Sequence, residues 1–350
     1  MTPLRGRAPG SDGTGGPAAA EPPATGRPYR LVEVCPPDRR PLRVLIHHGA
    51  CDAYVRVLSE RLPLRDLTGG ALEAEPLETV DVLLTWKPPA SVLARLAGLR
   101  WIQTTSAGID QILDFYRAHP DLIVTTTKGL QADSTASLAL ALMLSCFWRL
   151  PRLLERQQRA VWEKPAVGVL SAQTCAVVGL GHVGRRIAAH AAQLGMTVLG
   201  MRRGEEPVEG VARLYAEDRL RELLHAADYV VLALPLTHRT RRMFGDAEFA
   251  AMKRSAYLIN VARGGIVDED ALLRALRAGL IAGAAIDVFE EEPLPPTHPL
   301  WRAPNVVLTP HIGGDRADYV EGAAAIFVEN ARAFPDRDRM RGIASPTLGY

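Results

Sequence analysis

The stretch that decides the fold reads Cys175-Ala176-Val177-Val178-Gly179-Leu180-Gly181-His182-Val183-Gly184. Its first four residues are typical of a buried strand, and a helical pattern follows at residues 185–194. In such a unit the first glycine permits a tight turn, the second lets the backbone approach a pyrophosphate, and the third lets helix and strand pack closely. We therefore expect a dinucleotide site lined by Gly179, Gly181, His182, Val183 and Gly184.

Short apolar runs on both sides of this unit alternate with helical patterns, which favours an α/β fold with parallel sheets. The downstream runs are residues 197–200, 229–234, 256–260, 283–288 and 306–309. The upstream runs are residues 42–48, 80–86, 100–105 and 122–125. Residues 134–148 are apolar almost all round and predict a buried helix between the two series. A chain of 350 residues is long enough for two doubly wound domains.

Composition limits the partners and the compartment. A net charge of +2 gives no basic field for a nucleic acid, and no run approaches the ~20 apolar residues of a membrane span. The four cysteines form no CxxC pair, so we expect reduced thiols and no metal site. Residues 1–40 are rich in Gly, Pro and Ala and lack the apolar core of a signal peptide. They predict a disordered tail on a cytoplasmic protein.

Arg202 and Arg203 follow the second strand of the nucleotide unit. A site specific for NAD usually places Asp or Glu there, on the ribose 2′-hydroxyl. Two guanidinium groups would instead suit a 2′-phosphate, so NADP(H) is favoured as cofactor and NAD(H) is possible. The alternative is a pair of solvated surface arginines.

Three later segments carry reactive side chains: Asn260-Val261-Ala262-Arg263-Gly264-Gly265, Glu290-Glu291-Glu292-Pro293 and Thr309-Pro310-His311. Reduction of a 2-oxo acid needs a proton donor, which His311 could be, and a group that orients the ring, which Glu292 could be. Arg263 could bind the substrate carboxylate and polarise its carbonyl. Taken singly, each of these residues could also be an ordinary loop or surface residue.

In order and spacing, these motifs resemble the D-isomer-specific 2-hydroxyacid dehydrogenase family over about residues 41–350. The resemblance implies a catalytic triad of Arg263, Glu292 and His311. It also implies a Rossmann-type nucleotide domain, residues 134–315, inserted into a flavodoxin-like substrate-binding domain, residues 41–133 and 316–350. A cleft between the domains and a homodimer are further expectations.

The resemblance implies additional site residues. Those expected at the cofactor are Pro235, Thr240, Val261, Ala262 and Asp287. Asp287 would accept from the nicotinamide amide, although a buried acid that caps a loop is the alternative. Those expected at the substrate are Arg263, Lys87 and the backbone N–H groups of Ser106, Ala107 and Gly108.

The expected substrate is a small 2-oxo acid that is reduced reversibly to a D-2-hydroxy acid. Residues 86–89 resemble those of glyoxylate/hydroxypyruvate reductase-like members, which favours glyoxylate or hydroxypyruvate. Two alternatives remain open: a dehydrogenase for another small anion, such as phosphite, and an NAD(P)(H)-sensing, corepressor-like binding protein. Glu292 argues against formate as the hydride donor.

Overall fold

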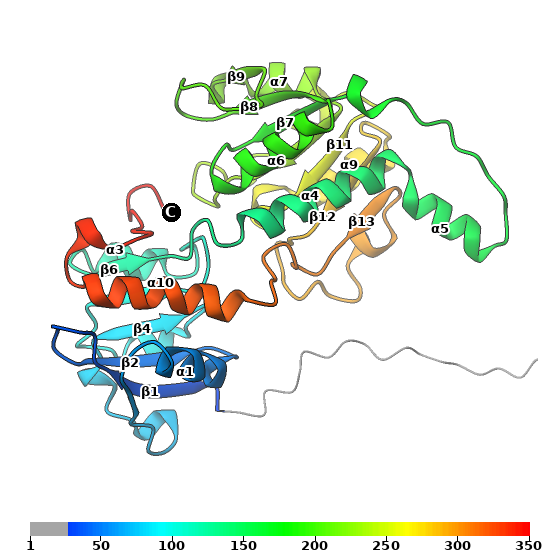
Figure 1. The fold of residues 1–350 in the computed structure, drawn as a ribbon. Helices are drawn as coiled ribbons and strands as arrows, with labels where there is room; N and C mark the ends of the chain where they lie inside the picture. The colour runs from blue at the N-terminus through cyan, green and yellow to red at the C-terminus, as the bar shows by residue number, and fades with distance from the viewer. Residues whose placement is uncertain (1–26) are drawn as a thin grey trace, which may run out of the picture.

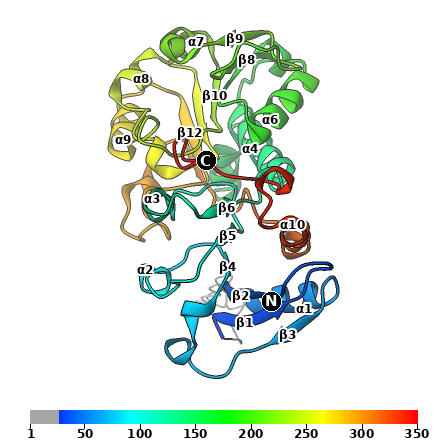
Figure 2. The same cartoon turned by 90° about the vertical axis from the view of Figure 1, so that its left-hand side faces the viewer.

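The computed structural model describes residues 27–350 and contains two α/β domains, one above the other in Figures 1 and 2. The predicted fold of two doubly wound domains is confirmed. The part of the predicted tail that residues 1–26 form lies outside the described residues.

The nucleotide domain is built on a seven-stranded sheet, and all of its strands are parallel. Its strands are β7 (Thr174–Val178), β8 (Thr197–Met201), β9 (Arg213–Tyr215), β10 (Tyr229–Leu232), β11 (Tyr257–Asn260), β12 (Gly283–Ile286) and β13 (Val306–Leu308). The order β9-β8-β7-β10-β11-β12 is that of the Rossmann fold, and β13 extends it. Short β9 is the one strand here that the sequence did not predict.

Helices cover both faces of this sheet (Figure 2). On one face lie α4 (Ala132–Phe147) and α6 (His182–Gln193). On the other lie α7 (Leu220–Ala226), α8 (Asp246–Ala251) and α9 (Glu269–Arg277). The apolar helix predicted at residues 134–148 is therefore α4, and its small residues Ala136 and Ala139 are buried.

The other domain, which is predicted to bind the substrate and is called here the substrate domain, has the strand order β3-β1-β2-β4-β5-β6. The bounds of the last four, which are parallel, are β2 (Leu42–His47), β4 (Val82–Thr85), β5 (Trp101–Thr104) and β6 (Ile123–Thr125). If β1 is left out, the sheet order is β3 (Leu64–Asp66), β2, β4, β5, β6. With these five strands numbered along the chain, that order is the flavodoxin-like 2-1-3-4-5. Helices α1 (Cys51–Ser59) and α10 (Tyr319–Ala333) pack on one face, and α2 (Ala90–Leu93) and α3 (Leu113–Ala118) on the other.

Strand β1 (Tyr29–Val34) corrects the predicted tail of residues 1–40. It lies between β2 and β3 and is antiparallel to both. Four of its six side chains are buried, so the strand adds apolar surface to the core on both faces of the sheet. Proline- and glycine-rich neighbours hide this short run in the sequence.

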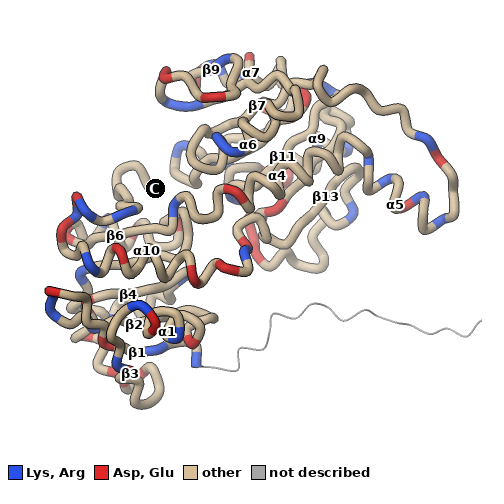
Figure 3. The backbone as a smooth tube through the Cα atoms, in the orientation of Figure 1, with Lys and Arg blue, Asp and Glu red and all other residues tan. Residues whose placement is uncertain are grey.

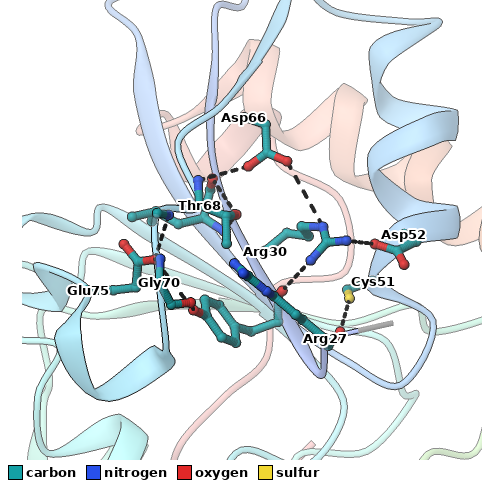
Figure 4. Close-up of polar contacts among 11 residues, drawn as sticks. Arg27, Arg30, Cys51, Asp52, Asp66, Thr68, Gly70 and Glu75 are labelled. Carbon is teal, nitrogen blue, oxygen red and sulfur yellow. Dashed lines mark hydrogen bonds and ion pairs between the residues drawn. The ribbon is translucent and has the colours of Figure 1, made fainter. Parts of the chain in front are cut away.

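Polar contacts fasten β1 to the elements around it (Figure 4). The guanidinium of Arg30 lies 2.5 Å from the carboxylate of Asp52 at the start of α1. The Cys51 thiol donates to the carbonyl of Arg27 over 2.8 Å. The Tyr29 hydroxyl of β1 donates to the carbonyl of Gly70, and Glu75 holds that loop by accepting hydrogen bonds from the backbone N–H groups of Gly69 and Gly70, at 2.8 and 2.9 Å.

Among residues 27–350, no single helix is long and apolar enough to cross a bilayer. Only α4 and α5 (Leu150–Gln158) together have the length and composition, and they are bent by 61° to one another.

Candidate active site

The glycine-rich turn joins β7 to α6, and at Gly179 and Gly184 it has no room for a side chain. Gly179 has a φ of +101°, and a Cβ on Gly184 would lie 1.8 Å from the carbonyl oxygen of Gly179. Gly181, the N-cap of α6, has nothing within 4 Å of its Cβ position and gives the helix no side-chain cap. Open backbone N–H groups at a helix N-terminus attract an anion, so this turn fits a pyrophosphate. His182 is exposed and Val183 half-buried beside it.

Arg202 and Arg203 lie at the carboxyl end of β8 and form ion pairs with exposed glutamates. Arg202 contacts Glu206 at 3.1 Å, and Arg203 contacts Glu217 at 3.1 Å. Such pairs contribute little to stability, so either guanidinium can exchange its carboxylate for a phosphate at small cost. The arrangement fits an NADP(H) site.

Two loops at the carboxyl edge of the nucleotide sheet contain four more of the predicted cofactor residues, Pro235, Thr240, Val261 and Ala262. In the first, the Thr240 hydroxyl donates to the Pro235 carbonyl over 2.7 Å. In the second, Val261 and Ala262 are buried directly after β11. The hydroxyl of Thr240 therefore organises its loop, and the backbone of both loops forms the edge on which a cofactor would lie.

Arg263 reaches from the nucleotide domain to the substrate domain. The Asn260 side chain holds its loop, accepting from the N–H of Ala262 and donating to the carbonyl of Arg263, each at 3.1 Å. The guanidinium Nε donates to the carboxylate of Asp110 over 3.3 Å. Another guanidinium nitrogen lies 2.7 Å from the Cβ position of Gly108. Sequence reasoning missed Asp110, although it stands two residues after the predicted substrate turn.

Residues 106–108 form a turn at the carboxyl end of β5, beside Arg263. The Ser106 hydroxyl donates to the Gly108 carbonyl over 2.6 Å. The backbone N–H groups of Ser106, Ala107 and Gly108 donate no hydrogen bond to another residue of the described chain. Free N–H groups next to a guanidinium suit a carboxylate. Lys87 is exposed after neighbouring strand β4 and has no hydrogen bond or ion pair with the triad between residues 27 and 350.

His311 and Glu292 are joined by the hydrogen bond that their predicted roles require. The distance from Nδ1 of His311 to Oε2 of Glu292 is 2.7 Å, and Oε1 accepts from the N–H of Phe289 over 2.9 Å. Burial acts to raise the pKa of Glu292, but these two hydrogen bonds and the charges of His311 and Arg263 outweigh it and lower that pKa. Glu292 therefore remains a carboxylate at neutral pH and holds Nδ1, which leaves Nε2 for a substrate.

Gly264 brings the Arg263 loop against the segment that carries Glu292. A Cβ on Gly264 would lie 1.9 Å from the carbonyl carbon of Phe289. No flexible side chain could move aside there, because the obstacle is backbone. This close approach places the guanidinium near enough for its charge to act on Glu292.

Asp287 is buried and supports the loop that carries His311. Its carboxylate accepts from the Thr309 hydroxyl at 2.6 Å and from the N–H groups of Ile312 and Gly313, both at 3.0 Å. His311 itself has a φ of +54°, a strained value that this network helps to maintain. The carboxylate thus acts as the loop cap considered above, and contact with the nicotinamide stays a prediction. Thr309 was not predicted.

The model of the family described as "D-isomer specific 2-hydroxyacid dehydrogenase, NAD binding domain" matches residues 140–313. A glyoxylate reductase of Thermococcus litoralis is 35% identical over 274 residues, covering 74% of this chain and 82% of the relative. A glyoxylate/hydroxypyruvate reductase A of Yersinia enterocolitica is 29% identical over 317 residues, covering 88% and 100%. The solved structure of a D-isomer specific 2-hydroxyacid dehydrogenase from Xanthobacter autotrophicus Py2 with NADPH and MES is 33% identical. It has a TM-score of 0.77 and covers 85% of this chain and 96% of that chain.

Proposed function

Because this chain belongs to the D-isomer specific 2-hydroxyacid dehydrogenase family, we propose that it reduces glyoxylate, hydroxypyruvate or a similar small 2-oxo acid. It is a nicotinamide-dependent oxidoreductase, and the product is a D-2-hydroxy acid. The observation that carries the proposal is the 2.7 Å bond between His311 and Glu292, with Arg263 beside them.

His311 is the proton donor in this proposal. When bound, the reduced nicotinamide supplies a hydride to the substrate carbon, and negative charge grows on the carbonyl oxygen. Nε2 of His311 donates a proton to that oxygen, and Glu292 stabilises the positive ring through Nδ1. In the oxidative direction the same nitrogen accepts the proton.

Arg263 and the turn at residues 106–108 bind the substrate. The guanidinium polarises the carbonyl, and together with the free N–H groups of Ser106, Ala107 and Gly108 it binds the carboxylate. Lys87 provides a further contact, because Thr85 and Thr104 pair at the ends of β4 and β5 and bring the two loops side by side.

NADP(H) is the favoured cofactor, and NAD(H) remains possible. Arg202 and Arg203 supply two guanidinium groups for the 2′-phosphate, and the relative from Xanthobacter was solved with NADPH. Pro235, Thr240, Val261 and Ala262 line the rest of the cofactor edge. Asp287 already accepts hydrogen bonds from the loop of His311, so a nicotinamide amide would have to share its carboxylate with that loop.

The test is a panel of 2-oxo acids assayed with NADPH and with NADH, followed by the absorbance of the reduced nicotinamide. We expect turnover with glyoxylate or hydroxypyruvate and a kcat/KM at least about tenfold higher with NADPH, the worth of one charge-assisted contact. Tight cofactor binding with no turnover would favour the sensor or corepressor alternative. Reduction of NADP⁺ with phosphite alone would favour the other-anion alternative.

The proposed assembly is a homodimer joined through residues 148–169, called here the arm. Half of the exposed large hydrophobic side chains between residues 27 and 350 lie in the arm: Trp148, Leu150, Leu154, Val161, Trp162 and Val169. Helix α5 has no buried residue, and the arm projects from the nucleotide domain in Figure 1. A second copy of the same arm would cover this apolar surface.

Light scattering during size-exclusion chromatography tests the dimer. We expect twice the chain mass of 38.0 kDa, and a monomer for Trp162→Glu, which charges a side chain that is 90% exposed. Trp301→Glu, at an exposed tryptophan outside the arm, is the control and should remain dimeric. A monomeric wild type would refute the assembly.

A further inference from the structure

Tyr350, the last residue of the chain, lies where the two domains meet (Figures 1 and 2). Nζ of Lys128 is 5.2 Å from the centroid of its ring, and the guanidinium carbon of Arg203 is 5.8 Å from it. Both distances are within the range of cation–π attraction. Arg203 also donates to the Tyr350 hydroxyl over 3.4 Å.

The fold fixes the position of this tyrosine. The Tyr116 hydroxyl donates to the carbonyl of Ala344 over 3.0 Å, which fastens the tail to α3. The tail then folds on itself, because the N–H of Ser345 donates to the carbonyl of Tyr350 over 3.1 Å. Between these points, the Cβ position of Gly349 lies 3.4 Å from Thr237 of the nucleotide domain. Tyr350 is therefore a placed side chain rather than a loose end.

Positive charge from both domains gathers beside the tail. Lys128 follows β6 and forms no ion pair with any residue between 27 and 350. It lies close to the glycine-rich turn, because the Cβ position of the next residue, Gly129, is 3.5 Å from Nδ1 of His182. Burial, and after it the charge of Lys128, lowers the pKa of His182. Figure 3 shows Lys and Arg positions of both domains around the C-terminus.

We propose that Tyr350 is a positioning residue that makes the cofactor site selective for a 2′-phosphate. Its ring attracts Lys128 and Arg203 together and so offsets the repulsion between the two cations. A dianionic phosphate gains from both charges, whereas a ribose with a free 2′-hydroxyl gains from neither. The inference rests on the proposed preference for NADP(H) and extends it to a residue outside the nucleotide domain.

Calorimetric titration of the full chain with 2′,5′-ADP and with ADP tests this role without turnover. The matched variants are Tyr350→Leu, which keeps apolar bulk but removes the ring, and Tyr350→Phe, which keeps the ring. We expect Tyr350→Leu to bind 2′,5′-ADP about threefold to tenfold more weakly, with ADP affinity within about twofold of wild type. Tyr350→Phe should retain most of the selectivity, because the ring carries the attraction.

Two controls separate the possible failures. Leu348→Ala changes an exposed neighbour in the same tail and should behave like wild type. Lys128→Gln should weaken 2′,5′-ADP and spare ADP. Equal selectivity in wild type and Tyr350→Leu would overturn the inference while leaving the NADP(H) preference standing. A wild type that binds both nucleotides equally would overturn the inference and the preference together, and neither result bears on the 2-oxo acid panel.

Discussion

Replacing Glu292 by Gln is the most informative change in the proposed active site. The carboxylate uses both oxygens as acceptors, from the N–H of Phe289 at 2.9 Å and from Nδ1 of His311 at 2.7 Å. An amide of the same shape has only one acceptor oxygen. Its NH₂ group must then face one of the two donors, or donate to an Nδ1 that has lost its proton. In either case the positive ring loses the anion that stabilises it.

A hydrogen bond to a charged group contributes about 1.5–3 kcal/mol. The side chains of His311 and Glu292 are 36% and 35% exposed, so solvent screening favours the lower half of that range. We therefore expect the reductive kcat to fall by about tenfold to fortyfold.

The measurement is kcat at saturating 2-oxo acid and NADPH, with NADPH affinity determined separately by fluorescence titration. Affinity should not change, because Glu292 orients the ring and does not hold the cofactor. A kcat within about threefold of wild type would show that the Glu292–His311 bond does not assist proton transfer.

Three further predictions follow from the same geometry. Wild type should be more stable than Glu292→Gln above about pH 5, and this difference should disappear as pH falls below the lowered pKa of Glu292. Thermal unfolding of both proteins from about pH 7 to pH 3 measures the difference, and a difference that does not change with pH would contradict the prediction. Arg263→Lys, which replaces a fork by a point charge, should lower kcat/KM by about a hundredfold, and a loss below about fivefold in steady-state assays would remove Arg263 from carbonyl polarisation. Gly264→Ala should destabilise the protein by about 1–3 kcal/mol in urea unfolding, because its Cβ meets the backbone of Phe289. The matched Gly265→Ala, where the nearest atoms are 3.4 Å away on the Leu236 side chain, should cost much less; equal losses would contradict the argument.

Local patterns made most of the fold predictable. The turn from Gly179 to Gly184 has strand and helix signals directly on either side, and the structure shows β7 and α6 there. Strand β1 was missed because its six residues lie within residues 1–40, whose Gly-, Pro- and Ala-rich composition predicts a tail. The position of β1 is set by its pairing with β2 and β3, and a short stretch of sequence does not show which strands will pair.

The same distinction separates the site residues that were predicted from those that were not. Glu292 and His311 stand in recognisable segments, and their bond spans 19 positions. Asp110 meets Arg263 across 153 positions, and Arg203 meets Tyr350 across 147. Those contacts exist only because the two domains face one another. The loop-capping role of Asp287 was an open alternative, but its partners, mostly backbone N–H groups of another loop, could not be identified from the sequence.

Proton donation by His311 is tested by single-turnover reduction of a 2-oxo acid with NADPH-loaded His311→Ala. We predict a rate of hydride transfer at least about a hundredfold below that of wild type, with NADPH affinity unchanged. A rate within about tenfold of wild type would contradict it and would assign the proton to another group.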